Sequence, residues 1–144
     1  NYRALLHRVR SWMKDDGRLC IHVFCHRDRA YPYETEGSDN WMGRYFFTGV
    51  IMPSFDLYHR YDDDRVIEEE WAVNGTHYGK TARAWRDLLE SRRKQVMPVL
   101  RSTYGDEASR WLHRWRLFFL ACEELFGYRD GQEWLVGHYR FRPR

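Results

Sequence analysis

The chain has 144 residues, a length that suits one domain. Its formal net charge is +3, from 24 basic and 21 acidic residues, which is too balanced for a dedicated nucleic-acid-binding protein. Charges interrupt every apolar stretch well short of the roughly 20 residues that cross a bilayer, so no membrane span is expected. Three cysteines imply no disulfide framework and fit a reducing compartment, so we expect a cytoplasmic protein.

Large aromatic side chains are unusually frequent and make up 17% of the residues. Such rings bury much apolar area, but they also build ligand pockets. Composition therefore predicts a ring-rich core without separating core rings from those of a binding site.

The first predicted elements are an amphipathic helix and a short strand. Apolar residues between Tyr2 and Met13 recur at helical spacing, and the turn residues Asp15, Asp16 and Gly17 follow. Residues 19–25 are apolar on both faces. This pattern predicts a central parallel strand that is covered on each side.

Residues 27–64 are predicted to form a mostly irregular lid. The segment contains prolines, several glycines and many aromatic residues, with short helices expected near 39–47 and 54–60. Long irregular segments within compact domains often cover functional sites.

The second half of the chain is predicted to contain strands at 65–73 and 133–141, separated by helices. Ile67, Trp71 and Val73 are expected to share one face of the first strand. A long helix over 77–103 follows the Asn-Gly turn, and Pro98 should kink or split it because proline removes a donor and clashes with the preceding turn. A last helix carries Trp111, Trp115, Phe118, Cys122 and Leu125.

The predicted element order places the chain in the α/β class. Three strands and a few helices leave the strand at 19–25 poorly covered, and no run of early strand-helix units supplies the rest of a sheet. The residues alone therefore predict an incomplete α/β fold.

His22 is the first candidate for chemistry. It lies towards the carboxyl end of its strand, where open α/β sheets bind ligands. A lone histidine in an apolar strand is more often a packed core residue, so both interpretations stay open on the residues alone. Cys20, Cys25 and His26 lie near it, but common zinc patterns place their ligands on turns, so no metal site is predicted.

Several segments resemble the cyclopropane-fatty-acid-synthase-like methyltransferases, a family that uses S-adenosylmethionine and includes coclaurine-type N-methyltransferases. Residues 71–85 resemble the signature Asn-Gly-x-His-Tyr-x-x-Thr-x-x-x-Trp, residues 17–26 the family's Gly-x-Leu-x-x-His-x-Phe/Ile strand, and residues 45–54 the segment Tyr-Phe-Phe-x-Gly-x-x-Met-Pro-Ser. The resemblance runs from Asn1 to Phe141 and covers about half of a typical family member.

The resemblance implies the C-terminal half of a Rossmann-like class I methyltransferase sheet, with its last strands and a lid. Residues 1–144 would be the C-terminal part of a single methyltransferase domain, and the lid its insertion at about 27–64. The βαβ half that binds the methyl donor is absent, and no donor-binding residue is expected in this half. No Gly-x-Gly follows a strand, so no helix N-terminus is prepared for the donor.

The resemblance also assigns roles to particular residues. His22 and Tyr78 match catalytic residues, which in cyclopropane synthases help to hold a bicarbonate that acts as general base. The backbone of Phe24 matches a further bicarbonate contact. Substrate-binding roles are expected for Phe24, Phe46, Tyr58 and Trp134.

The implied function is methyl transfer from S-adenosylmethionine to a small amine or to an unsaturated fatty-acyl chain. The motif details lean towards the coclaurine-type branch, but this half alone does not separate the two acceptors. The isolated chain is expected to be inactive, with a missing N-terminal half as its partner. The alternative is a non-catalytic fragment or module that binds a partner, or a second copy of itself, through an exposed sheet edge.

Overall fold

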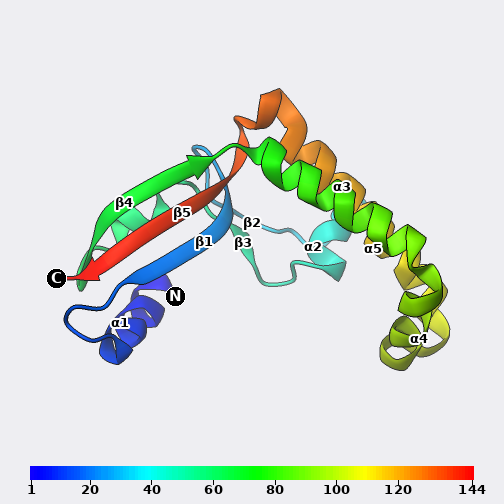
Figure 1. The fold of residues 1–144 in the computed structure, drawn as a ribbon, viewed down its shortest axis with the longest axis horizontal. Helices are drawn as coiled ribbons and strands as arrows, with labels where there is room; N and C mark the ends of the chain where they lie inside the picture. Colours follow the sequence, from blue (N-terminus) through cyan, green and yellow to red (C-terminus); the bar gives the residue numbers. More distant parts are fainter. The chain divides into compact units, whose positions relative to one another are not determined.

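A computed structural model describes all 144 residues and divides the chain into two units (Figure 1). The first unit contains Asn1–Val73 and Glu133–Arg144, and the second contains Asn74–Gln132. Strands occur in the first unit and long helices in the second, so the chain is α/β as predicted. None of the helices combines the length and the apolar character that a membrane crossing requires.

The first unit is built around a three-stranded sheet. Its elements are α1 (Tyr2–Trp12), β1 (Leu19–His26), β2 (Tyr31–Pro32), α2 (Trp41–Tyr45), β3 (Ile51–Met52), the 3-10 helix η1 (Leu57–Arg60), β4 (Arg65–Val73) and β5 (Trp134–Pro143). The strand order is β1-β5-β4, and both pairings are antiparallel. Predicted lid residues 27–64 hold only short elements, including the two expected helices.

The prediction of a central parallel strand at 19–25 is wrong for this sheet. β1 pairs antiparallel with β5 and forms one edge, apart from a single bridge between His26 and Ser54. Cys20 and His22 are exposed, so only one face of most of the strand is covered. The second face of the strand includes the polar His22 beside Cys20 and Phe24, so it is not a fully apolar face.

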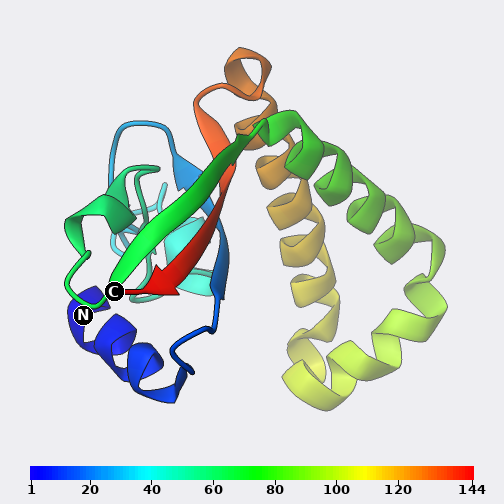
Figure 2. The ribbon, with the colours of Figure 1, turned by 60° about the vertical axis from the view of Figure 1, so that its left-hand side comes forward.

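The core of the first unit lies on one face of the sheet. Leu6 of α1 and Tyr58 of η1 pack there against Tyr139 and Phe141 of β5. Figure 2 shows α1 and η1 on this side of the strands. The aromatic content predicted such a core, and perpendicular ring contacts such as Tyr58–Tyr139 at 4.8 Å are favourable.

A β-bulge in β4 changes which residues share a face. Ile67 pairs with Phe141 on the core face, whereas Trp71 pairs with His138 on the opposite face, because the register shifts between Ile67 and Glu69. The prediction that Ile67 and Trp71 share a face is therefore wrong. An extra residue in one strand reverses the alternation beyond it.

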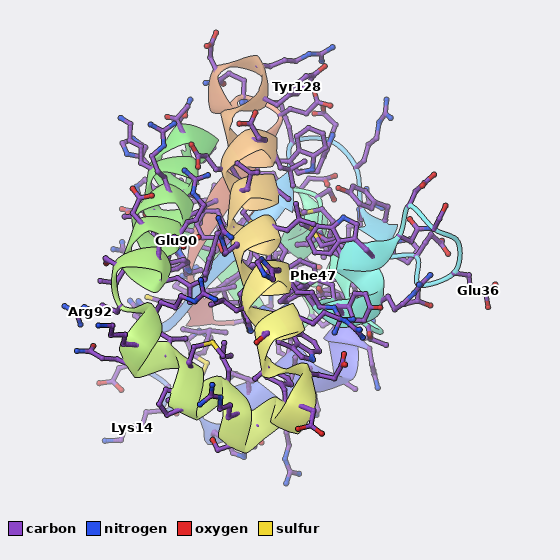
Figure 3. The ribbon with its side chains drawn as sticks, turned by 90° about the vertical axis from the view of Figure 1, so that its right-hand side faces the viewer. Lys14, Glu36, Phe47, Glu90, Arg92 and Tyr128 are labelled. Carbon is purple, nitrogen blue, oxygen red and sulfur yellow. The ribbon has the colours of Figure 1, made fainter.

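The second unit consists of α3 (Gly75–Ser91), α4 (Arg93–Tyr104), η2 (Gly105–Glu107), α5 (Ala108–Gly127) and η3 (Tyr128–Gly131). The long predicted helix ends at Arg92 and not at Pro98, which lies inside α4. Figure 3 labels Glu90 and Arg92 at this change of direction. The expected site of the break is wrong, because α4 tolerates the missing donor of Pro98 on its exposed side.

Helices α3 and α5 pack closely along their length. A side chain added at Gly79 would lie 3.2 Å from the carbonyl oxygen of Glu123, so glycine permits the close approach. Arg83 of α3 donates from Nε to the Glu123 carboxylate at 2.5 Å. A second cluster, with Leu100, Ala108 and Leu112 at its centre, joins α4 to α5.

Candidate functional site

The face of the sheet opposite the core carries three of the six predicted site residues, His22, Phe24 and Trp134. We call it the histidine face, and it contains Cys20, His22 and Phe24 of β1, Trp134, Val136, His138 and Arg140 of β5, and Trp71 of β4. The strands place these side chains together because alternate residues of paired strands point to the same side.

His22 is exposed and contacts a second histidine across the sheet. His22 and His138 are directly paired residues of β1 and β5, with ring centroids 4.6 Å apart and ring planes at 87°. His138 is partly buried, and desolvation followed by the nearby His22 lowers its pKa. The imidazole of His138 is therefore favoured in its neutral form.

Phe24 and Trp134 extend the histidine face towards the lid. The Phe24 ring lies 5.7 Å from the ring of Phe47. The indole Nε1 of Trp134 donates to the Tyr31 hydroxyl at 2.9 Å, and its ring meets His26 edge-on at 5.2 Å. These contacts tie the lid residues to the sheet next to His22.

Phe46 and Tyr58 have different surroundings. Phe46 follows α2 in the lid, and its ring lies 6.0 Å from that of Trp41. Tyr58 is 5% exposed and belongs to the core on the other face of the sheet, where burial raises its pKa to about 12. The geometry thus favours a packing role for Tyr58.

Tyr78 belongs to the second unit, where it lies in the first turns of α3. Its ring is partly buried, 4.5 Å from the ring of Phe126, and burial raises the pKa of its hydroxyl. The structure therefore brings His22, Phe24 and Trp134 onto one face, with Tyr58 on the opposite face and Tyr78 in the other unit.

The N-terminus of α3 does not fit the anionic end of a methyl donor. The Asn74 side chain caps it by accepting from the Thr76 amide at 2.8 Å, and Asn74 Nδ2 donates to the Asp130 carbonyl at 2.7 Å. Gly131, with φ of 72°, lies so close that an added Cβ would meet Asn74 Oδ1 at 2.2 Å. The Thr76 amide at the helix end already has a hydrogen-bond partner, and Gly131 of the same unit covers the Asn74 cap. These residues therefore do not form a donor site.

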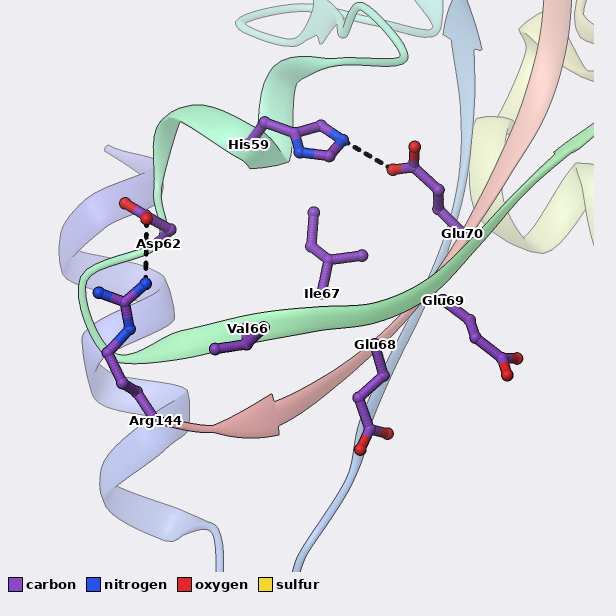
Figure 4. Close-up of a pocket in the computed structure, with 8 residues that line it drawn as sticks. All are labelled: His59, Asp62, Val66, Ile67, Glu68, Glu69, Glu70 and Arg144. Carbon is purple, nitrogen blue, oxygen red and sulfur yellow. Dashed lines mark hydrogen bonds and ion pairs between the residues drawn. The ribbon is translucent and has the colours of Figure 1, made fainter.

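A separate hollow of about 390 Å³ lies along β4 (Figure 4). Its charged rim includes His59, paired with Glu70 at 2.8 Å, and Asp62, paired with Arg144 at 3.1 Å. None of the predicted site residues lines it, and its acidic groups have basic partners of their own. We therefore place the candidate site at the histidine face and not in this hollow.

His138 is the site residue that sequence reasoning missed. The alternation of residues 135–141 could have placed it on the same face as Trp134 and Arg140. No sequence signal gives the register between β1 and β5, and it is the register that places His138 beside His22.

Known proteins match the whole chain. The family model for mycolic acid cyclopropane synthetase matches residues 1–134. The (S)-coclaurine N-methyltransferases of Thalictrum flavum subsp. glaucum and Papaver somniferum are 32% and 31% identical to the chain over its full length. The chain spans only 41% and 42% of these relatives, in their C-terminal part.

Solved structures agree in fold. A crystal structure of coclaurine N-methyltransferase bound to N-methylheliamine and SAH superposes with a TM-score of 0.88 at 32% identity, over 99% of this chain and 42% of that one. The cyclopropane synthase MmaA2 from Mycobacterium tuberculosis gives a TM-score of 0.73 at 13% identity, over 98% of this chain and 49% of that one. At that identity the second likeness shows the fold alone.

Proposed function

The chain belongs to the mycolic acid cyclopropane synthetase family, and from this premise we propose that it is the C-terminal, substrate-side half of an S-adenosylmethionine-dependent methyltransferase. The observation that carries the proposal is the likeness to coclaurine N-methyltransferase along nearly the whole chain. That relative is bound to SAH, the form that the donor takes after it has lost its methyl group.

The proposed acceptor is a small amine. Relatives named for the N-methylation of amines are about one third identical to the chain, whereas the cyclopropane synthase structure is 13% identical. The other acceptor that the family resemblance implies is an unsaturated fatty-acyl chain. The experiment below distinguishes the amine from the acyl chain.

His22 is the proposed catalytic residue of this half. Its imidazole is exposed on the histidine face, where it can hold a bicarbonate that removes the proton which the amine nitrogen must lose. Phe24, Phe46 and Trp134 are proposed to wall the acceptor, since aromatic faces attract cationic amines. The Tyr78 hydroxyl is proposed to donate a hydrogen bond to a group bound in the site of the complete enzyme. Tyr58 is excluded from this proposed wall, because its burial in the core supports a packing role.

The donor is proposed to be held by residues outside these 144, and the Asn74 cap at the start of α3 supports this. S-adenosylmethionine supplies an activated methyl group when bound, and this chain supplies the acceptor side. This bicarbonate, held by His22 and by the Phe24 backbone, is a second proposed cofactor. Removal of bicarbonate from the assay should then lower the rate.

The test joins this chain to the part of the Thalictrum flavum (S)-coclaurine N-methyltransferase that precedes the match. We expect the joined protein to transfer labelled methyl from S-adenosylmethionine to coclaurine, and the isolated chain to transfer none. His22→Gln should lower kcat about 100-fold, because the base that His22 holds would be displaced. His59→Gln, in the same unit but away from the histidine face, should leave kcat unchanged.

The outcomes separate the candidates. Transfer only to an unsaturated phospholipid would replace the amine by an acyl chain. Failure to methylate either acceptor, by a joined protein that is folded and binds the donor, would overturn the proposed function.

A second candidate rests on the edges of the sheet. β1 and β4 are both edge strands, and edge strands present unpaired backbone groups to other chains. A module that pairs through β1 with another copy would sediment as a concentration-dependent dimer. A monomer at all concentrations would count against it.

A further inference from the structure

A cluster of positive charge lies on and beside α4. The second unit contains 11 basic and 7 acidic residues, although the formal net charge of the whole chain is only +3. Residues 91–105 include no acidic residue and four basic ones, which we call the α4 cations: Arg92, Arg93, Lys94 and Arg101. Figure 3 labels Arg92 at the bend where α3 ends and α4 begins. The charge imbalance of the second unit is thus concentrated in this segment.

The α4 cations have no counter-ion within the structure. All four are exposed, and none of them makes an ion pair or a side-chain hydrogen bond. Glu90, the nearest acid before the segment, is paired with Arg116. Asp106, just after it, lines a hollow of about 360 Å³ together with Arg101 but forms no ion pair with it. The segment therefore presents a net positive charge to solvent.

Helical spacing spreads these cations over the two flanks of α4. Leu100 is buried against α5, so the opposite side of α4 faces away from the rest of its unit. At about 100° per residue, Lys94 and Arg101 lie on one flank of that outward side, and Arg92 lies towards the other flank. The outward side between the flanks holds uncharged, exposed residues: Gln95, Pro98 and Ser102.

This arrangement suits a fluid, negatively charged surface. Long basic side chains on both flanks of a helix can reach lipid phosphates while the uncharged side between them lies against the headgroups. Clusters of Lys and Arg on such helices bind anionic lipids, with about a fivefold gain in partitioning for each cation. Val99, 63% exposed, is the only large apolar side chain exposed on α4, so the contact depends on charge more than on insertion.

Two other anionic partners fit this surface less well. Single-stranded nucleic acids stack their bases on free aromatic rings, and the one aromatic residue of α4, Tyr104, is half-buried and stacked on Trp111 at 4.2 Å. An acidic protein would need an apolar anchor in a shaped pocket, and only Val99 is exposed on this helix. The surface therefore favours lipid.

We propose that α4 binds the headgroups of anionic membrane lipids and attaches the second unit reversibly to a negatively charged membrane. Attachment is electrostatic, because the apolar side of α4 is already packed against α5. None of the residues assigned to methyl transfer takes part, so the proposal does not rest on the proposed function.

The first test measures sedimentation of the pure chain with lipid vesicles. We expect binding to vesicles of phosphatidylcholine that contain about one third phosphatidylserine, and none to phosphatidylcholine alone. Because salt screens exposed charges, raising its concentration from about 0.1 M to about 0.5 M should release the chain. Equal binding to both kinds of vesicle, or binding that persists at the higher salt concentration, would overturn the proposal.

The second test removes charge from α4. Lys94→Gln combined with Arg101→Gln should lower partitioning into the anionic vesicles about 25-fold, at about fivefold for each charge. The matched control combines Lys14→Gln with Arg29→Gln, which removes the same charge from exposed positions of the first unit and should have little effect. Circular dichroism should show the same fold in both variants, because all four side chains are exposed.

The remaining outcomes identify the partner. Equal loss of binding in the α4 variant and in the control would show that overall charge, and not α4, binds the vesicles, and it would overturn the proposal. Tight binding of a single-stranded RNA oligonucleotide, by a chain that does not sediment with the vesicles, would assign the surface to nucleic acid instead. The joined protein described above should show the same dependence on lipid and salt, and its failure to bind anionic vesicles would also contradict the proposal.

Discussion

The tightest packing in the first unit occurs where Tyr139 folds over Gly137 on the core face of β5. Tyr139 is 1% exposed, and its hydroxyl donates to the Phe55 carbonyl at 2.7 Å. Cys25, fully buried, lies against the same two residues, and its thiol is hydrogen-bonded to Tyr139. Only glycine leaves room for the tyrosine ring at this point of the strand.

Gly137→Ala should therefore destabilise the chain. The added Cβ would lie 2.5 Å from the Tyr139 hydroxyl oxygen and 2.7 Å from a ring carbon, so a fully buried ring has to move. We expect a loss of about 1–3 kcal/mol in the free energy of unfolding, measured with urea. Gly127→Ala is the control, since its φ is −82° and no atom lies within 4 Å of the added Cβ. Equal stability of the two variants would contradict the close packing.

The three thiols should differ sharply in reactivity. Burial raises the pKa of both Cys25 and Cys122 to about 11, whereas Cys20 is exposed. Because only the thiolate reacts, a pKa of 11 leaves about one thiol in a thousand reactive at pH 8. We expect iodoacetamide to label one cysteine quickly in the native chain and three in urea, and Cys20→Ser to abolish the fast label. Rapid native labelling of a second thiol would show that the burial is wrong.

At the scale of elements, the junction between β4 and α3 depends on one side chain. Asn74 caps α3 through the Thr76 amide and also holds the turn before β5 through the Asp130 carbonyl. Asp130 and Gly131 both have positive φ, which this turn requires. One asparagine thus satisfies a helix start and stabilises a left-handed turn 56 residues later in the chain.

Asn74→Ala should lower the free energy of unfolding by about 1–2 kcal/mol, because α3 loses its cap. Asn74→Asp keeps an oxygen for the cap but loses the donor to Asp130, so it should have an intermediate stability. Thr81→Ala, which removes an exposed hydroxyl from the same helix, serves as the control and should change stability by less than about 0.5 kcal/mol. If Asn74→Ala and Thr81→Ala have the same free energy of unfolding, the cap does not stabilise the chain.

Local patterns predicted the elements of this chain better than their pairing. The helix at α1, the strand at 65–73 and the Asn-Gly junction follow from periodicity and turn residues, and the structure confirms them. The bulge near Glu68 and the end of α3 at Arg92 depend on packing against other segments, which periodicity does not encode. His22 was found through a family motif, whereas His138 required the strand register.

At the scale of the whole molecule, we propose a substrate-side surface on this chain and a donor site elsewhere. The histidine face belongs to the first unit, and Asn74 and Gly131 cover the start of α3. The chain spans about two fifths of the coclaurine N-methyltransferases, which agrees with a donor site in the remaining part. We therefore propose that residues outside these 144 bind the methyl donor.

The most direct test is calorimetric titration of S-adenosylmethionine into the pure 144-residue chain, with the joined protein as the positive control. We expect heat of binding for the joined protein and none for the isolated chain. Binding to the isolated chain with a micromolar Kd would mean that these residues build a donor site by themselves, and it would contradict the proposed substrate-side role.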